Sequence, residues 1–168
     1  MRDDERAGFS RAVLPHLDAA WRLARALVRE KSAAEDVVQD ALVRALTYFS
    51  TDRIGDGRAW LLRIVRTTAI TRGIATTRRA EDPLDTEGAH ADIADTTATP
   101  EAQLAHRERE ATLTERLAAL PPELREALVL KELEQLSYRD IAEITGVPIG
   151  TVMSRLWRAR QLLLDHRP

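Results

Sequence analysis

The stretch that decides the fold is LSYRDIAEITGVPIGTVMSRLWRAR, residues 136–160. It opens with Ser137, whose hydroxyl can accept a hydrogen bond from a free N–H of a first helical turn. Apolar residues then follow at helical spacing as far as Gly146, which supplies the backbone freedom for a sharp turn. Beyond the turn, Val152 and Leu156 stand four apart and give a second helix an inner face. The pattern predicts a helix-turn-helix, whose second helix enters the major groove of DNA.

Composition narrows the class of protein. A chain of 168 residues allows one large domain or two small ones, and 44% hydrophobic residues are enough for compact helical cores. The chain has no cysteine, which excludes disulfides, thiolate metal sites and a cysteine nucleophile. No apolar run approaches the roughly 18 residues that span a bilayer. The charged N-terminus leads into no signal-peptide core, so we expect a cytoplasmic protein.

The net charge of −2 hides an uneven distribution. Residues 1–80 carry 15 Lys and Arg against 10 Asp and Glu, whereas residues 81–105 carry seven Asp and Glu and no Lys or Arg. Residues 106–168 carry ten of each sign. An acidic connector therefore masks a basic N-terminal part, which suits a nucleic-acid partner.

Apolar spacing predicts further helices at about 9–29, 32–46, 58–76, 101–120 and 122–134. We expect Pro15 to shorten or kink the first of them. Ser32 to Glu35 has the pattern of a capping box at the start of the second. No segment alternates like a strand. The predicted fold class is all-α, with two small helical domains joined by a flexible acidic linker and a helix-turn-helix in the C-terminal one.

Four motifs together resemble an extracytoplasmic-function sigma factor, the minimal two-domain class of bacterial transcription initiation factor. They are AEDVVQD (34–40, followed by Arg44-Ala45), AWLLRIVR (59–66), LPPELRE (120–126) and the helix-turn-helix. They stand in the family's order and spacing and cover nearly the whole chain. The resemblance implies a region 2-like domain at 1–80, a linker at 81–105 and a region 4-like domain at 106–168. It implies a non-enzymatic protein that directs core RNA polymerase to particular promoters and is held by an anti-sigma factor.

The resemblance assigns the second predicted helix to polymerase docking, on the clamp helices of the largest subunit. A cluster of carboxylates and amides beside an apolar stripe suits arginines on a partner helix. The alternative is a solvated helix face. The docking residues implied are Glu35, Asp36, Gln39, Asp40 and Arg44.

The resemblance assigns the third predicted helix to capture of the melted minus-ten strand. Such capture needs cations that follow the backbone and a pocket for unstacked bases. The residues implied are Arg58, Trp60, Arg63, Arg66, Thr67, Thr71 and Arg72, although core packing is the favoured interpretation of the tryptophan. Where the family commonly has Asn and Asp, this chain has Thr67 and Thr71. A hydroxyl cannot make the two-point contact of an amide, so minus-ten recognition is expected to be permissive.

The resemblance assigns the helix-turn-helix to the minus-thirty-five element. Residues near the start of its second helix would read bases, and later arginines would hold phosphates. The residues implied are Ser137, Tyr138, Thr151, Ser154, Arg155 and Arg158. We expect Trp157 to pack between helices and not on DNA.

Other functions find little support in the sequence. The four histidines are scattered and no glycine loop suits a phosphate, so no catalytic residue, metal, cofactor or small-molecule substrate is predicted. The resemblance implies that the acidic linker threads toward the active-site and RNA-exit region of the polymerase; the alternative is a solubilising tether. One alternative function is a helix-turn-helix regulator that acts without polymerase, but no dimerisation helix is visible and the free protein is expected to be a monomer. The other is a sigma-like decoy or adaptor with weak promoter melting.

Overall fold

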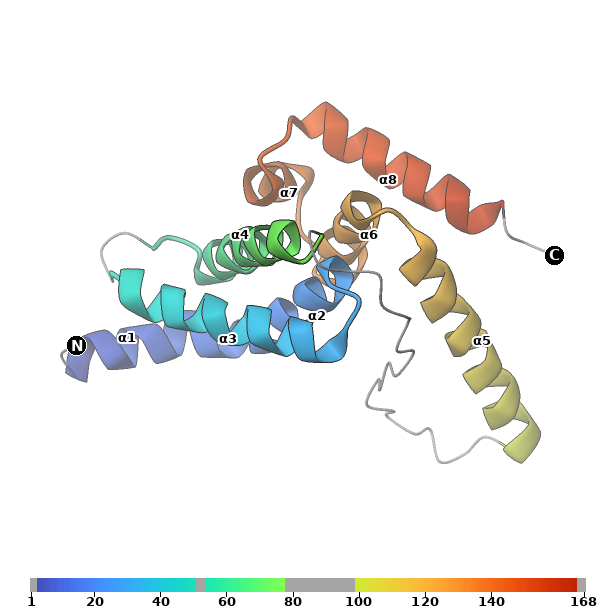
Figure 1. Ribbon diagram of the computed structural model, residues 1–168, viewed down its shortest axis with the longest axis horizontal. Coiled ribbons are helices and arrows are strands. Elements are labelled where there is room, and N and C mark those ends of the chain that lie inside the picture. Colours follow the sequence, from blue (N-terminus) through green and yellow to red (C-terminus); the bar gives the residue numbers. More distant parts are fainter. Residues whose placement is uncertain (1–2, 51–53, 78–98, 166–168) are drawn as a thin grey trace.

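The computed structural model describes residues 3–50, 54–77 and 99–165, and every regular element within them is a helix (Figure 1). Residues 81–98 of the predicted acidic linker lie outside the described residues. The elements are α1 (Asp3–Val13), η1 (Leu14–His16), α2 (Leu17–Leu27), α3 (Lys31–Tyr48), α4 (Gly57–Thr77), α5 (Pro100–Ala119), α6 (Pro122–Leu128), η2 (Val129–Leu133), α7 (Tyr138–Thr145) and α8 (Ile149–Leu164).

The N-terminal helices follow the predicted pattern with two local differences. Pro15 breaks the expected first helix into α1 and α2, joined by the single turn η1, because proline has no N–H to donate within a helix. The predicted capping box at Ser32 is wrong. Helix α3 begins one residue earlier, at Lys31, so the Ser32 hydroxyl lies inside the first turn and donates to the carboxylate of Glu30 instead.

Small residues let the N-terminal helices pack closely. The buried face of α3 is largely alanine, at positions 34, 41 and 45, and α2 and α4 lie against it. Helix α4 contributes Leu61, Leu62 and Val65 to the same core. At its start, a Cβ on Gly57 would stand 2.1 Å from the backbone oxygen of Ala12, so only glycine fits this approach of α4 to α1.

The helix-turn-helix forms as the sequence predicts. The Ser137 hydroxyl accepts a hydrogen bond from the N–H of Asp140, and the Asp140 carboxylate accepts one from the N–H of Ser137, a reciprocal cap at the start of α7. Gly146 ends α7 with a φ of 70°, a left-handed conformation that glycine adopts without strain. Helix α8 then turns Val152, Leu156 and its alanine at 159 inward against α6 and α7.

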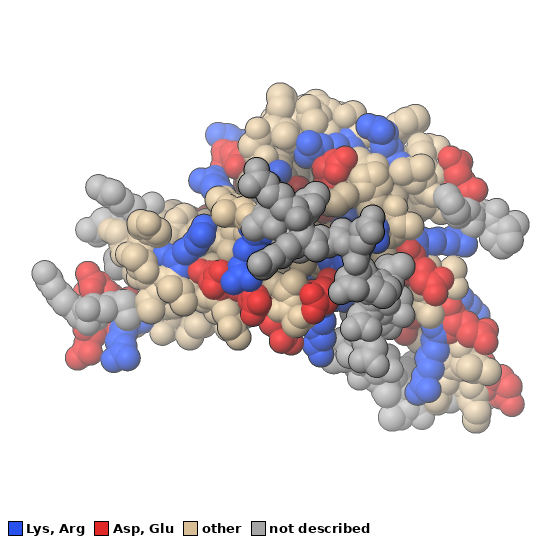
Figure 2. Space-filling view, in the orientation of Figure 1, with Lys and Arg blue, Asp and Glu red and all other residues tan. Residues whose placement is uncertain are grey.

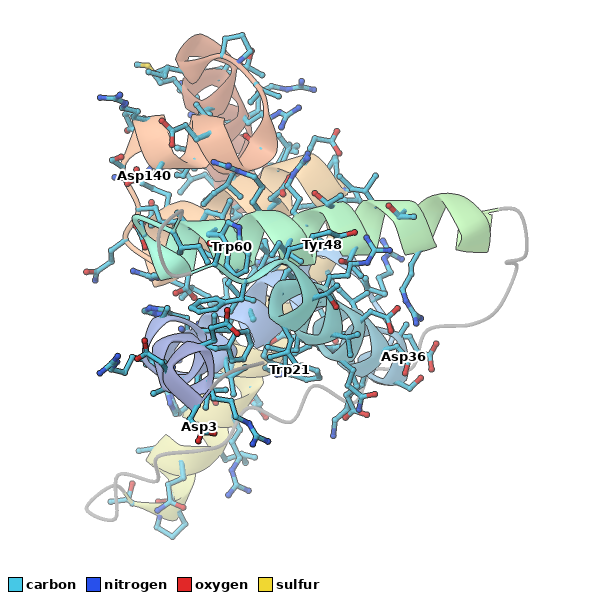
Figure 3. All side chains as sticks on the ribbon, turned by 90° about the vertical axis from the view of Figure 1, so that its left-hand side faces the viewer. Asp3, Trp21, Asp36, Tyr48, Trp60 and Asp140 are labelled. Carbon is cyan, nitrogen blue, oxygen red and sulfur yellow. The ribbon has the colours of Figure 1, made fainter. Side chains whose placement is uncertain are left out.

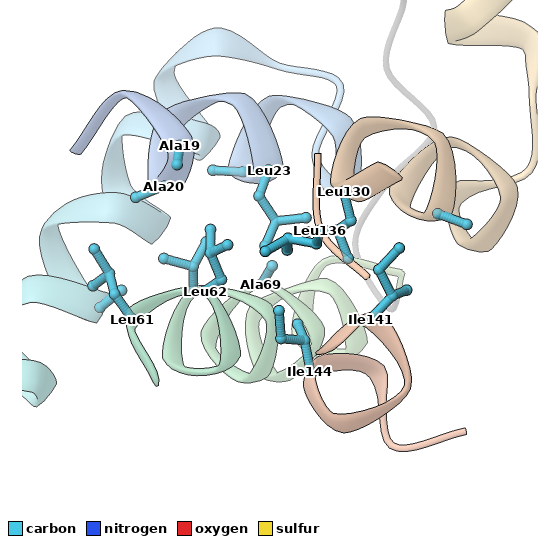
Figure 4. Packing of buried hydrophobic residues seen from close by; sticks show 14 of the residues in the cluster. Ala19, Ala20, Leu23, Leu61, Leu62, Ala69, Leu130, Leu136, Ile141 and Ile144 are labelled. Atoms are coloured by element: carbon cyan, nitrogen blue, oxygen red, sulfur yellow. The ribbon is translucent and has the colours of Figure 1, made fainter. Parts of the chain in front are cut away.

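The two groups of helices share one continuous core, a relation that the sequence left open. Helix α2 packs on α6, and α4 packs on α7. Figure 4 shows Leu23 and Leu62 of the N-terminal helices facing Leu130, Leu136 and Ile144 of the C-terminal ones. By contrast, α5 buries none of its residues and extends away from the rest of the molecule (Figure 1). Among the described helices, none combines the length and apolar character needed to cross a membrane.

Candidate polymerase and nucleic-acid interfaces

The predicted docking residues share the outward face of α3. Glu35, Asp36 and Gln39 are exposed there, and Asp40 is half-buried at the edge of the face. In Figure 3, Asp36 lies on the opposite side of the molecule from Asp140, which marks the helix-turn-helix. Arg44 is exposed one turn beyond Asp40. The structure therefore brings the five residues onto one accessible helix face.

Arg72 belongs to this acidic face and not to an isolated basic surface. It donates from Nε to an Asp40 carboxylate oxygen at 2.7 Å, and its Nη1 lies 3.4 Å from Asp36. The hydrogen bond to Asp40 raises the pKa of the Arg72 guanidinium and outweighs the opposing effect of burial. Side chains of both signs accordingly lie next to one another where α3 and α4 run together (Figure 2). Sequence spacing gave no signal for this pairing, because the partners are more than thirty positions apart.

The other arginines of α4 point toward the C-terminal helices. Arg58 donates from Nη2 to the Glu134 carboxylate and to the Glu134 backbone oxygen, both at 2.6 Å. Arg66 donates from Nε to the Glu126 carboxylate at 2.6 Å. Arg63 lies 4.0 Å from the Glu143 carboxylate, and both side chains are about half exposed. Three arginines of the predicted minus-ten set are thus brought together, but each faces a carboxylate of the C-terminal helices.

The two threonines that depart from the family pattern are exposed on α4. The Thr67 hydroxyl donates to the backbone oxygen of Arg63 at 2.9 Å, and the Thr71 hydroxyl donates to that of Thr67 at 2.8 Å. Each hydroxyl proton is therefore used within the helix. What remains for a base or a phosphate is the acceptor capacity of the oxygen and the methyl group.

Trp60 lies in an aromatic cluster at the start of α4. Its ring meets Phe49 edge to face with centroids 6.3 Å apart, and Phe49 meets Phe9 in the same way at 5.4 Å. The side chain is partly buried against the core. The expectation that Trp60 packs against the core is consistent with this position, although its side chain is only partly buried.

Of the residues predicted to read upstream DNA, some take part in contacts within the fold and others lie at the surface. Ser137 is occupied as the cap of α7, and Tyr138 is half-buried with the Lys131 ammonium 4.8 Å from its ring centre. On α8, Thr151 is half-buried, and its backbone oxygen accepts a hydrogen bond from the exposed Ser154 hydroxyl. Ser154 therefore stands at the surface of the second helix.

The two α8 arginines that the sequence assigned to DNA lie in different surroundings. Arg155 is half-buried, close enough to lower the pKa of Glu126 by its charge. Arg158 is exposed. Of the two, Arg158 is the more exposed.

The expectation that Trp157 packs between helices is wrong. Its side chain is 63% exposed, and Met153, one turn earlier, is 52% exposed. The inner face of α8 is already filled by Val152 and Leu156, so the residue that follows each of them is turned about 100° away. That arithmetic was available in the sequence and would have placed both apolar side chains on the outer face.

The described residues contain no group of three or more histidines, aspartates or glutamates that could hold a metal ion. Two carboxyls whose pKa values are shifted, Glu126 and Glu134, lie instead between the helix groups. Burial raises the pKa of Glu126 even though Arg66 opposes the shift. Burial acts in the same direction on Glu134, but hydrogen bonds from Arg22 and Arg58 outweigh it and lower that pKa.

Comparison with known proteins identifies the class. Residues 12–79 match Sigma-70 region 2, and residues 110–163 match Sigma-70 region 4. The chain is 38% identical to the RNA polymerase sigma-H factor of Pseudomonas aeruginosa over 96% of its own length and 86% of the relative's. It is 35% identical to the ECF RNA polymerase sigma-E factor of Escherichia coli K12, over 76% of this chain and 70% of that protein.

Solved structures agree with this assignment. The sigma factor RpoE from Bartonella quintana, crystallised with the anti-sigma factor NepR, is 28% identical, with a TM-score of 0.64 over 95% of this chain and 98% of that one. CnrH, in complex with the cytosolic domain of CnrY, is 26% identical, with a TM-score of 0.61 over 95% and 89%. The chain belongs to the extracytoplasmic-function family of sigma factors, which are not enzymes and direct RNA polymerase in transcription initiation. This decides against a regulator that acts without polymerase.

Proposed function

We propose that this sigma factor binds core polymerase through α3, captures the minus-ten strand on α4 and reads the minus-thirty-five element with α8, acting in the cytoplasm. Residues 1–80 and 106–168 are the two functional domains, and the acidic segment 81–105 connects them, with its last residues already in α5. The ranges that match sigma regions, 12–79 and 110–163, fall within these two domains and support the division.

The observation that carries the upstream assignment is the charge of α8. From Ile149 to Leu164 the helix has three arginines and no acidic residue. Its outer face is not covered by any other described helix, because its contacts run through the inner face to α6 and α7. A cationic helix that follows a turn and leaves one face free fits the major groove, where arginine can bind guanine or phosphate.

The exposed apolar side chains of α8 extend this contact set. Met153 and Trp157 lie on the same side as Ser154 and Arg158. In the major groove the C5 methyl group of thymine is the apolar feature that such side chains can contact. We propose that they favour thymine at one or two upstream positions, while Arg158 holds a guanine or a phosphate.

The test is transcription in vitro from a promoter library with a randomised upstream element, using core polymerase and the full-length chain. Arg158→Ala should lose about 1–3 kcal/mol of discrimination at one promoter position if the arginine reads a base. A phosphate contact would instead weaken every promoter alike and reduce the salt dependence. Arg107→Ala removes an equally exposed arginine from α5 and serves as the control. Identical base preferences and yields in the wild type, Arg158→Ala and Arg107→Ala would contradict the proposal that α8 reads the upstream element.

The assignment of α4 to the minus-ten strand rests on Arg58, Arg63 and Arg66, which all face the C-terminal helices. Cations that follow one another along a helix suit the phosphate backbone of a single strand. Thr67 and Thr71 lie on an exposed part of the same helix. Their lack of an amide favours permissive base recognition at the minus-ten element.

An anti-sigma factor is the regulatory partner that we propose for this chain, which we expect to be a monomer when free. Support comes from the similar sigma factor RpoE, which was solved in complex with the anti-sigma factor NepR. For the acidic linker, seven carboxylates without a cation would compete with nucleic acid if the segment threads toward the polymerase active site, and would solubilise a tether if it does not. Both roles are compatible with its composition.

A further inference from the structure

Two glutamates of the C-terminal helices are buried where the two domains meet. The side chain of Glu134 is 1% exposed and that of Glu126 is 2% exposed. A carboxylate removed from water in this way requires a cation and hydrogen bonds, because its desolvation is otherwise costly. These two carboxylates receive their cations from the other domain.

The cations are three arginines of α2 and α4. Arg22 donates to both carboxylate oxygens of Glu134, at 2.5 and 3.2 Å, and Arg58 adds a third hydrogen bond at 2.6 Å. Arg66 binds Glu126 at 2.6 Å. We call these five residues, Arg22, Arg58, Arg66, Glu126 and Glu134, the interdomain clasp.

A further contact shows that the interface is built and not incidental. The guanidinium of Arg125 is buried; it donates from Nε to the backbone oxygen of Ala26 in α2 and from Nη1 to that of Ala118 at 2.9 Å. Within the described residues, no buried side-chain nitrogen or oxygen lacks a hydrogen-bond partner. The polar groups of the interface are therefore satisfied when the domains are together, and separation would return them to water.

The clasp uses the groups that strand capture needs. Arg58 and Arg66 belong to the face of α4 that is proposed to hold the minus-ten strand, and Arg63 beside them faces Glu143. A carboxylate and a phosphate compete for the same guanidinium, because both accept its paired donors. The outer face of α8 takes no part in the clasp.

We propose that the interdomain clasp is an autoinhibitory contact, which holds the free protein closed and keeps the arginines of α4 from single-stranded DNA until the two domains separate. The inhibitory role of the clasp rests on the proposed function of α4 in minus-ten capture, and it describes how that function is regulated. It acts on minus-ten capture and leaves the upstream helix accessible. A closed chain therefore binds single strands only through its small open fraction, which lowers the apparent affinity by that fraction.

The decisive variant is Glu134→Arg, which places a third cation against Arg22 and Arg58. Its matched control is Glu132→Arg, two positions away, which changes the net charge equally. Glu132 is exposed and pairs with Arg160 inside the C-terminal domain, so its reversal leaves the clasp intact. Because added positive charge alone strengthens binding to DNA, only the difference between the two variants reports on the clasp. Neither glutamate belongs to the proposed DNA-binding or polymerase-binding residues.

Two measurements are made on each full-length protein. Small-angle X-ray scattering should give a larger radius of gyration for Glu134→Arg than for the wild type or for Glu132→Arg. Fluorescence anisotropy with a labelled single-stranded oligonucleotide of randomised sequence should show a gain in affinity of ~10-fold for Glu134→Arg over its control, if the open fraction rises by that factor. Helical content is checked by circular dichroism, and the isosteric Glu134→Gln, with a smaller gain, replaces the reversal if that variant does not fold.

Each outcome decides something different. An unchanged radius of gyration in folded Glu134→Arg and Glu134→Gln overturns the clasp. An opened protein that binds the oligonucleotide no better than Glu132→Arg shows that the contact does not inhibit, and also overturns the proposal. Adding Arg66→Gln to Glu134→Arg should abolish most of the gain. If the gain persists while scattering still reports opening, the strand-binding role of α4 fails and the closed contact stands.

Discussion

Thr67 and Thr71 are the residues at which this chain leaves the pattern of its family, and their hydroxyls are satisfied inside α4. A threonine whose hydroxyl donates to the carbonyl one turn earlier presents only an acceptor oxygen and a methyl group outward. A flipped-out base therefore meets a less selective surface than an amide would provide. We therefore expect these threonines to affect discrimination between bases and not the folding of the domain.

Thr67→Asn should sharpen minus-ten preference, because an amide adds a donor and an acceptor at a fixed spacing. The expected gain is about 1–3 kcal/mol of discrimination at one position, read from transcription over a library randomised at the minus-ten element. Thr47→Asn is the matched control, since Thr47 is exposed on α3 and its hydroxyl makes the same bond to the preceding turn. A wild-type protein already as selective at the minus-ten as at the upstream element would contradict the expectation.

Trp157 shows how far residue type can mislead. A large aromatic side chain favours burial on average, but its position on α8 puts it on the outer face, beside Met153 and away from Leu156. Met153 and Trp157 thus add an exposed apolar pair to a helix that carries three arginines. The spacing carried this information, and the average preference of tryptophan hid it.

At the scale of the element, α3 presents its acidic cluster on a rigid support. Alanines on the opposite face fix the helix against α2 and α4, so outward substitutions leave the packing intact. Arg72 binds Asp40 strongly and Asp36 less closely. The two aspartates are therefore unequal tests of docking, because reversal of Asp40 also breaks a contact within the domain.

Asp36→Arg should weaken binding to core polymerase by ~10-fold or more, since like charges would meet across the proposed contact with clamp arginines. Binding can be measured by anisotropy of the labelled sigma factor titrated with core polymerase. Asp4→Arg, on the exposed side of α1, makes the same change of charge away from α3. Equal affinities for the two variants, with unchanged circular dichroism, would mean that the α3 face is only solvated and does not bind polymerase.

At the scale of the whole molecule, the two buried glutamates respond to acid in opposite ways. Burial raises the pKa of Glu126, so its charged form costs stability above that pKa, and the cost vanishes as the pH falls through it. For Glu134, the hydrogen bonds from Arg22 and Arg58 overcome burial and lower the pKa. Its contribution to stability is complete above the ordinary value of 4.5 and is lost as the pH falls through the lower, folded value.

Urea unfolding from neutral pH to about pH 3 should separate these effects. At neutral pH, Glu134→Gln should be less stable than the wild type, and the difference should shrink only below pH 4.5. Glu126→Gln should be closer to the wild type or more stable, with a difference that changes above pH 4.5. Parallel curves for the two variants would mean that the carboxyls are not held as the structure places them.

Much of the fold could be predicted from local pattern. The cap at Ser137, the turn at Gly146 and the inner face at Val152 and Leu156 depend on residues three or four apart, and all three were found where the sequence places them. The start of α3 was not predicted to the residue, because Glu30 and not Ser32 is the N-cap, and the Ser32 hydroxyl donates to the Glu30 carboxylate instead of capping the helix. The candidate site was predicted as a set of faces on helices, and the docking face of α3 is accessible as expected.

The sequence by itself determined an all-helical chain, its helix-turn-helix and its family, because helix periods, caps and motif order are written in neighbouring residues. Only the tertiary structure decided that Arg58 and Arg66 face Glu134 and Glu126 and that Arg72 faces Asp40. These partners are 76, 60 and 32 positions apart. Any of the chain's 25 cations could satisfy a given carboxylate on charge alone. The choice is made by the packing of α2 on α6, of α4 on α7 and, for Arg72, of α4 on α3, which no local spacing specifies.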